Sequence, residues 1–255
     1  MFDSHCHPTD IEDPVEVIRS AIRAGLRSLL ACGYNMQSNL KVEELRASFP
    51  SLPIAVGLHP WYSNESMDGI RAQILRALPV AIGECGLDAA DDPTIPSLVT
   101  QRPVFEAQLD LAAEMSLPVT VHSRRAVSMV QDILGNFSTV RGVMHAYSGS
   151  YEQAKSFVMR GWLIGICGSV TRVRSERIRK LATRLPLSGI AVETDAPAIG
   201  IGDVPPPHTR PAHLPRIVEE IAVLRGISRD EVIATTNANV EDLFGERVRQ
   251  PLVVC

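Results

Sequence analysis

The feature that most constrains this chain is a regular alternation of short apolar segments with longer amphipathic segments. The apolar segments are rich in Val, Ile and Leu and are too short to be helices. The segments between them, such as PVEVIRSAIRAG and VFEAQLDLAAEM, have the periodicity of amphipathic helices. The predicted strands are Met1–His5, Ser28–Cys32, Ile54–Leu58, Val80–Glu84, Val119–His122, Gly142–His145, Trp162–Ile166 and Ile190–Glu193.

Eight strands that alternate with helices predict an α/β fold in which a parallel sheet closes into a (β/α)8 barrel, the TIM barrel. The chain has 255 residues, a length typical of one such barrel, so we expect a single domain over residues 1–255. An open doubly wound sheet is the alternative, but no G-x-G-x-x-G motif follows the first strand. We also expect a last barrel helix at Leu214–Arg225, followed by two short helices over residues 228–245.

Composition indicates where the protein works. The net charge of −4 gives no overall attraction to polyanions. No apolar run approaches the ~20 residues that cross a bilayer, so we expect no membrane partner. The five cysteines lack C-x-x-C spacing, which is typical of a reducing compartment. The first motif begins at Asp3, which leaves no room for a signal peptide before it, and we therefore expect a cytoplasmic protein.

Ligand-type side chains follow six of the eight predicted strands. In a barrel these strand ends meet at one mouth, where catalytic groups of the fold lie. One histidine after a strand is usually structural, and one Glu-Thr-Asp is usually a turn cap. Together, however, these residues lie at the same position relative to their strands, and Asp3, His5 and His7 also share one strand face, which indicates a common site. The residues are His5, His7, His59, Glu84, His122, His145, Glu193 and Asp195.

This set contains more imidazoles and carboxylates than one tetrahedral ion needs. It suits two divalent cations that share a bridging carboxylate. Imidazole-rich sites favour Zn, Mn, Fe or Co, whereas carboxylates and water also permit Mg. The sequence predicts two divalent metal ions and leaves their identity open among Mg, Mn and Zn.

Several motifs in this order resemble those of the TatD-like metal-dependent deoxyribonucleases, a branch of the amidohydrolase-type barrels. The resemblance covers nearly the whole chain. Its strongest motifs are DSHCH, GLHP, GECGLD, HAYSG and ETDAP, together with the spaced Gln, Phe and Gln of QRPVFEAQLDLAAEMSLPVTVHSR. The closing segments PAHLPRIVEEIA and NVEDLF also match the family.

The resemblance implies roles for individual residues. One ion would be held by His5, His7, Glu84 and Asp195, and the other by Glu84, His122 and His145, with Glu84 as the bridge. His59 would line the site and contact phosphate or bound water. Arg124 would hold a substrate phosphate, or alternatively be a solvated charge at the start of a helix. Asp3 would orient a histidine ligand from behind.

The resemblance also implies a reaction, the hydrolysis of phosphodiester bonds in DNA by a hydroxide formed on two metals. Asp195 would take the proton of the water, and Glu84 would be catalytic as the bridging ligand. The implied substrate is a single-stranded end cleaved by an exonuclease, with RNA possible. A small-molecule amidohydrolase or lactonase and a partner-binding barrel subunit remain alternatives. Many binuclear relatives of the first kind use a lysine from the fourth strand, and PVAIGECG contains none.

Some segments depart from the family pattern or have two interpretations. The family usually has Arg-Asn-Glu-Pro where this chain has His208-Thr209-Arg210-Pro211, and an aromatic residue near Ala89-Ala90. The basic segment from Arg172 to Lys180 is either a phosphate-binding patch or a solvated helix face. Trp61, Tyr62 and Tyr147 are either base-stacking platforms or rim packing.

Overall fold

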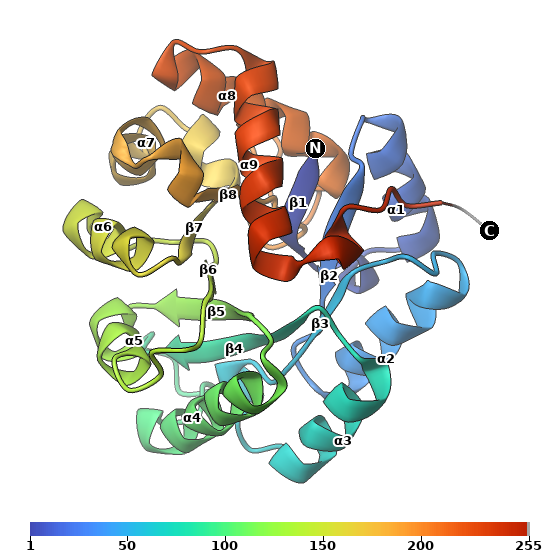
Figure 1. The fold of residues 1–255 in the computed structure, drawn as a ribbon, viewed down its shortest axis with the longest axis vertical. Helices are drawn as coiled ribbons and strands as arrows, with labels where there is room; N and C mark the ends of the chain where they lie inside the picture. Colours follow the sequence, from blue (N-terminus) through green and yellow to red (C-terminus); the bar gives the residue numbers. More distant parts are fainter. Residues whose placement is uncertain (254–255) are drawn as a thin grey trace.

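The computed structural model describes residues 1–253 and contains one sheet of eight parallel strands in the order β1 to β8 (Figure 1). The strands are β1 Phe2–Cys6, β2 Ser28–Cys32, β3 Ile54–Val56, β4 Ala81–Asp88, β5 Val119–Arg124, β6 Gly142–Met144, β7 Leu163–Ile166 and β8 Ile190–Val192. Backbone hydrogen bonds from Asp195 N to His5 O (2.9 Å) and from His7 N to Ala196 O (2.8 Å) join the two edge strands just beyond β8. The predicted (β/α)8 barrel is confirmed.

Helices surround the sheet on its outer side (Figure 1). They are α1 Pro14–Arg23, α2 Met36–Glu44, α3 Met67–Ala77, α4 Leu98–Met115, α5 Val127–Leu134, α6 Tyr151–Met159, α7 Glu176–Arg184, α8 Leu214–Arg225 and α9 Arg229–Phe244. The bounds of α8 are those predicted. The prediction of two short helices after it is wrong, because α9 is one helix of 16 residues. Its Asn239 side chain donates hydrogen bonds to Leu187 O and Ile190 O, and such tertiary contacts outweigh a low helix propensity.

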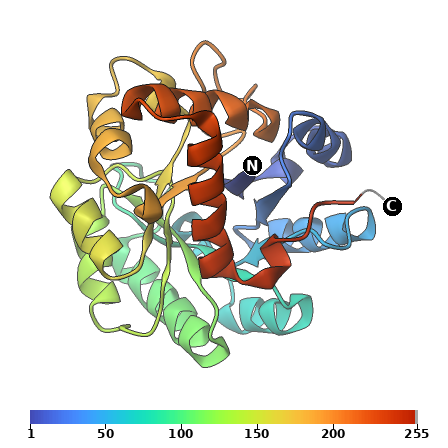
Figure 2. The ribbon, with the colours of Figure 1, turned by 45° about the horizontal axis from the view of Figure 1, so that its top comes forward.

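Helix α9 covers the end of the barrel at which the strands begin, and Figure 2 shows it crossing that opening. Val240 and Phe244 of α9 pack in one buried cluster with barrel residues such as Leu30 and Ala81. The rings of Phe2 and Phe244 lie 6.5 Å apart. The end of the barrel at which the strands begin is therefore a filled hydrophobic core.

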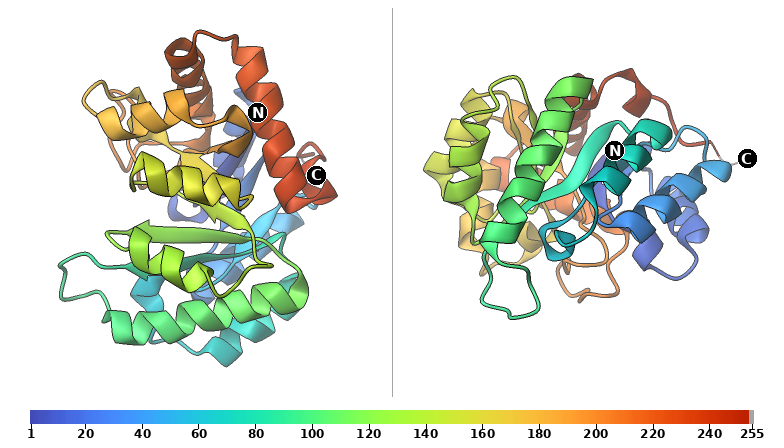
Figure 3. Two further views of the ribbon diagram at one scale, coloured as in Figure 1. Left: turned by 60° about the vertical axis from the view of Figure 1, so that its left-hand side comes forward. Right: turned by 90° about the horizontal axis from the view of Figure 1, so that it is seen from below.

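The opposite end of the barrel carries the loops that follow the strands. The loops after β4 and β8 project on this side, away from the N-terminus (Figure 3, right). This end is the mouth at which the predicted site residues should meet. Among residues 1–253, no helix is both long enough and apolar enough to cross a membrane.

Candidate metal centre

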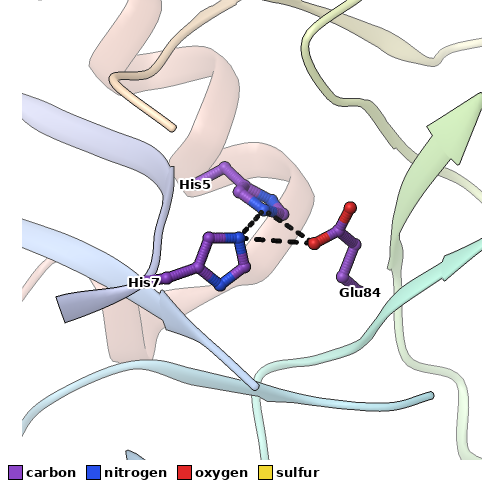
Figure 4. Close-up of side chains that lie close together, drawn as sticks. All are labelled: His5, His7 and Glu84. Carbon is purple, nitrogen blue, oxygen red and sulfur yellow. Dashed lines mark hydrogen bonds and ion pairs between the residues drawn. The ribbon is translucent and has the colours of Figure 1, made fainter. Parts of the chain in front are cut away.

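Glu84 lies at the centre of the mouth and is 4% exposed. Its two carboxylate oxygens face different groups of histidines. Oε2 lies 3.4 Å from His5 Nε2 and 3.3 Å from His7 Nε2, as Figure 4 shows. Oε1 lies 3.3 Å from His59 Nε2, 3.1 Å from His122 Nδ1 and 3.0 Å from His145 Nε2. A carboxylate between two sets of donors is the arrangement of a ligand that bridges two ions.

Asp195 lies beside the first of these sets. Its Oδ1 is 3.6 Å from His7 Nε2 and 3.9 Å from His5 Nε2. The backbone of Asp195 has a φ of 50°, a conformation that non-glycine residues rarely adopt. Donor atoms close enough for one ion come from three overlapping groups: His5 with His7 and Glu84, His5 with His145 and Asp195, and His59 with Glu84 and His122. The structure thus brings all six predicted metal ligands together.

The free nitrogen of each histidine follows from the partner of its other nitrogen. His7 Nδ1 lies 2.9 Å from Cys32 O, which only accepts, so Nδ1 carries a proton and, in the neutral ring that a metal ligand requires, Nε2 has the lone pair. His122 Nε2 donates to Asp88 Oδ2 at 3.2 Å, which leaves Nδ1 free toward Glu84. Metal-bound histidines usually have such a carboxylate or carbonyl partner. Two histidines therefore present the nitrogen that a cation needs.

His59 is arranged in the opposite way. Its Nδ1 accepts the N–H of Trp61 at 3.2 Å, so in the neutral ring the proton is on Nε2. Burial lowers the pKa of His59 to about 4, so the ring is neutral at pH 7. The N–H at Nε2 points at Glu84 Oε1. His59 is therefore built as a hydrogen-bond donor, although its position would also allow a metal contact.

His5 and His145 complete the set. His5 Nδ1 lies 2.8 Å from Thr120 Oγ1, and the two imidazole rings stack with centroids 3.9 Å apart. His145 Nδ1 is buried without a hydrogen-bond partner among residues 1–253, and lies 3.7 Å from Glu193 Oε1. Glu193 accepts hydrogen bonds from Ser4 Oγ and Ala146 N, so it connects the middle of β1 to the loop that follows β6. His5 and His145 both direct Nε2 toward Glu84.

The electrostatics of the cluster favour cation binding. Burial alone would raise the pKa of Glu84, but the surrounding histidines hold it well below its usual range. Asp195 is likewise kept ionised by His145 and His7 despite its burial. For His7, burial acts downward, yet hydrogen bonds to Asp195 and Glu84 raise the pKa to about 10. Without cations, protons on the histidines therefore balance the two carboxylates.

Local backbone geometry places Glu84 where these donors converge. The register of β4 against β5 shifts between Ile82 and Cys85, and such bulges redirect side chains near active sites. Gly83 (φ 140°) lies within the shift and Gly86 (φ 136°) follows it, and a Cβ at Gly86 would lie 2.1 Å from His122 O. The G-E-C-G sequence thus reflects both backbone conformation and close strand approach. Strand β4 runs to Asp88, beyond its predicted end, because it pairs with β5 as far as Asp88 opposite Arg124.

Helix α4 fixes two strand ends through glutamines spaced seven residues apart. Gln101 accepts from Asp88 N (2.8 Å) and donates to Asp88 O (2.9 Å). Gln108 does the same for Leu58, with distances of 2.8 and 3.0 Å. Each amide therefore satisfies both backbone groups of the residue that it contacts. The spaced glutamines noted in the sequence position the GECGLD and GLHP motifs.

Asp3 has a different role from the one expected. It is fully buried, and its carboxylate accepts hydrogen bonds from Thr194 N (2.9 Å), Thr194 Oγ1 (2.6 Å) and His5 N (3.3 Å). It contacts no imidazole in the described part of the chain. Asp3 therefore orients the backbone on either side of the metal centre, next to His5 and Asp195.

Asp88 is the main site residue that sequence reasoning missed. Besides His122, its Oδ2 accepts from Trp61 Nε1 at 2.8 Å and lies 3.9 Å from Arg124 Nη1. Burial opposes ionisation, but the hydrogen bond from His122 and its neighbours lowers the pKa of Asp88 to about 2. The only sequence signal was the final Asp of GECGLD. Its connection to His122 depends on the pairing of β4 with β5.

The mouth opens into a cavity of about 520 Å³. Tyr34, Trp61 and Tyr62 line it on the side of β2 and β3, and Arg124 and Ser148 line it on the side of β5 and β6. Trp61 is 47% exposed, in agreement with a stacking platform, whereas Tyr147 is 2% exposed. Of the two interpretations of Tyr147, the structure supports packing, because the side chain lies beneath the rim against Phe157. Tyr34 was not predicted.

The donor set fits divalent cations. Five imidazoles and two ionised carboxylates converge, two of the rings present a lone pair fixed by a hydrogen bond, and one carboxylate separates the donors into two groups. Zinc, manganese and magnesium each accept combinations of these ligands. Fold and site together define the class of metal-dependent hydrolase barrels.

Comparisons with known proteins give the family. A family model described as TatD related DNase matches residues 2–245. The chain is 35% identical to the 3'-5' ssDNA/RNA exonuclease TatD of Citrobacter rodentium, over 96% of this chain and 98% of that protein. It is 31% identical to the uncharacterized metal-dependent hydrolase YjjV of Escherichia coli K12, over 96% and 97%. The crystal structure of that YjjV, described as a TatD homolog, superposes with a TM-score of 0.86 at 30% identity, covering 96% and 97% of the two chains.

This chain belongs to the TatD-related DNase family. The resemblance inferred from the motifs is confirmed.

Proposed function

We propose that this protein is a metal-dependent nuclease that removes nucleotides from single-stranded ends of DNA, with RNA as a further substrate. The observation that supports this most directly is Glu84, whose two oxygens face two separate groups of nitrogen donors. Family membership supplies the bond type, and relatives such as the Citrobacter rodentium protein are named 3'-5' ssDNA/RNA exonucleases.

Two divalent cations complete the proposed site, drawn from Mg, Mn and Zn. His5, His7, Glu84 and Asp195 would hold one, and Glu84, His122 and His145 the other. When bound, such ions lower the pKa of a water molecule and neutralise charge on phosphoryl oxygens. Asp88 and Cys32 O maintain the required tautomers of His122 and His7 from behind.

The remaining polar groups bind the substrate and move the proton. Asp195 is ionised and lines the cavity, so its carboxylate accepts the proton of the attacking water. His59 donates its Nε2–H to a phosphoryl oxygen, because its other nitrogen is occupied by Trp61 N–H. Arg124, whose side chain is 53% exposed, pairs with the same phosphate.

The cavity suits the end of a single strand. Its volume of about 520 Å³ is that of a small-molecule site and is too small for a duplex. Trp61, Tyr34 and Tyr62 give the terminal base a place to stack. The cytoplasm remains the proposed location, since Cys6, Cys32, Cys85 and Cys167 are buried free thiols.

The test is a nuclease assay of metal-reconstituted protein on end-labelled single-stranded DNA, duplex DNA and RNA. We expect stepwise shortening of the single strands, with loss of at least a thousandfold in Glu84→Ala. Glu44→Ala, an exposed glutamate of α2, is the matched control and should keep full activity. Equal cleavage by Glu84→Ala would contradict the proposal. Cleavage of cyclic amides or lactones without nuclease activity would instead favour a small-molecule hydrolase.

A further inference from the structure

The active-site cavity continues into two neighbouring hollows on one side of the mouth. The first hollow shares Ala146, Ser148 and Ile199 with the cavity. The second meets the first at Ser148 and Arg177. The continuous depression that starts at Ser148 is called here the arginine groove. Its basic residues are Arg125 after β5, and Arg174, Arg177 and Lys180 in and before α7.

The basic residues of the groove are available to a ligand. Arg125, Arg174 and Arg177 are exposed, and none forms an ion pair with any of residues 1–253. Other arginines of the same segment are already engaged. Arg179, for example, pairs with Glu220. An exposed arginine whose charge is not balanced nearby suits a phosphate.

The carboxylates that face the groove are few. Glu152 and Glu176 line the hollow that contains Arg174 and Lys180. Among residues 1–253, no carboxylate lines the hollow that contains Arg125 and Arg177, where Ser128, Ser148 and Gln153 supply hydrogen-bonding groups. The groove therefore becomes more positive toward Arg125 and Arg177.

The opposite side of the mouth has the reverse character. Strands β2 and β3 lie across the barrel from β6 and β7, and Figure 1 shows α2 and α3 on the other side from α6 and α7. The loops after β2 and β3 carry Tyr34, Trp61 and Tyr62. Asp10 also lines this side and accepts a hydrogen bond from the Tyr34 hydroxyl at 3.0 Å. A phosphate backbone would be repelled by Asp10, whereas a base would stack on the aromatic rings.

We propose that the arginine groove binds the phosphates of the nucleotides next to the scissile bond, while the terminal base stacks on Tyr34, Trp61 and Tyr62. This inference rests on the proposed nuclease function and adds to it the path and orientation of the strand. Arg177 is the central contact, because it lines both hollows and its Nη1 donates to Ser148 O at 3.0 Å, next to the active-site cavity. Because the net charge of −4 gives the whole molecule no attraction to a polyanion, the attraction has to come from a local basic surface such as this groove.

The first test compares substrate lengths. We expect Arg177→Glu to raise KM for a twelve-nucleotide single strand at least tenfold more than KM for a dinucleotide measured on the same preparation. Arg177→Lys should restore most of the difference, since phosphate binding along a groove depends mainly on charge. Arg184→Glu is the matched control, because it makes the same charge change on an exposed position of the same helix, outside both hollows. An equal change in KM for the two lengths would overturn the inference.

The second test is binding, which needs no turnover. Fluorescence anisotropy of a labelled twelve-nucleotide strand gives the slope of log K against log salt. Loss of one phosphate contact should reduce this slope by about 0.7 in Arg177→Glu. A purely structural role of Arg177 at Ser148 would leave the slope unchanged and would also overturn the inference. A third outcome separates the two proposals: the wild-type protein binds the strand but cleaves no substrate, and Arg177→Glu shows the reduced slope. In that case the nuclease proposal would fail and the groove would remain a strand-binding site.

Discussion

At the scale of single residues, the metal centre depends on which nitrogen of each imidazole carries a proton. Cys32 O accepts a hydrogen bond from His7 Nδ1, and Asp88 accepts one from His122 Nε2, so in each neutral ring the nitrogen that faces Glu84 has the lone pair. In His59 the nitrogen that faces Glu84 carries the proton instead, because the other nitrogen accepts the N–H of Trp61. Residues of one type, at equivalent strand ends, therefore have different chemistry. The sequence showed all three histidines, but their hydrogen-bond partners come from other strands and loops.

This difference predicts a contrast between two alanine variants. His122→Ala should lose at least one bound metal ion, because it removes a nitrogen with a free lone pair. His59→Ala should keep the wild-type metal content and lose about 100-fold to 1,000-fold in kcat, the cost of removing one hydrogen-bond donor to a developing charge. Elemental analysis of the purified proteins, with kinetics on a single-stranded oligonucleotide, checks both. Loss of metal in His59→Ala would show that His59 is a ligand.

At the scale of elements, strand positions were predictable and strand ends were not. Apolar segments bounded by polar residues locate β2 with its observed bounds, and the common register of ligand-type residues locates the mouth. The shift in β4 depends on Gly83 and Gly86 approaching β5, which only the paired strands reveal. The link between Asp88 and His122 has the same origin. Helix α9 was divided in the prediction because its contacts with the β8 region are tertiary.

The glutamines of α4 make a prediction about stability. Gln108→Leu would leave the buried N–H and C=O of Leu58 without partners. An unpaired buried polar group costs about 1–3 kcal/mol, so the variant should lose about 2–4 kcal/mol of unfolding free energy. Urea unfolding of the metal-free protein measures this. Gln37→Leu, an exposed position in α2, is the control and should change stability by less than about 0.5 kcal/mol. Equal stability of the two variants would contradict the role given to Gln108.

At the scale of the whole molecule, the apolar core and the candidate metal centre occupy opposite ends of the barrel. Helix α9 and the apolar cluster around Phe2 and Phe244 fill one end, and buried charges gather at the other. Burial of so many titratable groups is stabilised by their mutual pairing, in which protons on histidines take the place of cations. If cations bind at the mouth, as proposed, they would displace protons from these histidines.

The exchange predicts proton release on metal binding. Burial acts against the charged ring, but the neighbouring carboxylates raise the pKa of His7 to about 10, so His7 is protonated at pH 7 in the metal-free protein, and they also raise the pKa of His122 and of His145. Metal ligation needs them neutral, so binding should release protons and metal affinity should increase with pH below about 10. Calorimetric titration with Mn²⁺ in buffers of different ionisation enthalpy measures the release. Binding without proton release would contradict the assigned ligands.

The most direct test of the account is anomalous diffraction from crystals grown with Mn²⁺. Two bound ions should appear as two anomalous peaks, one next to His5 and His7 and one next to His122 and His145, with a different oxygen of Glu84 bound to each. Crystals of Glu84→Ala should lose at least one of the peaks. A single peak, or peaks that do not contact Glu84, would contradict the central claim that this carboxylate bridges two cations at the mouth of the barrel.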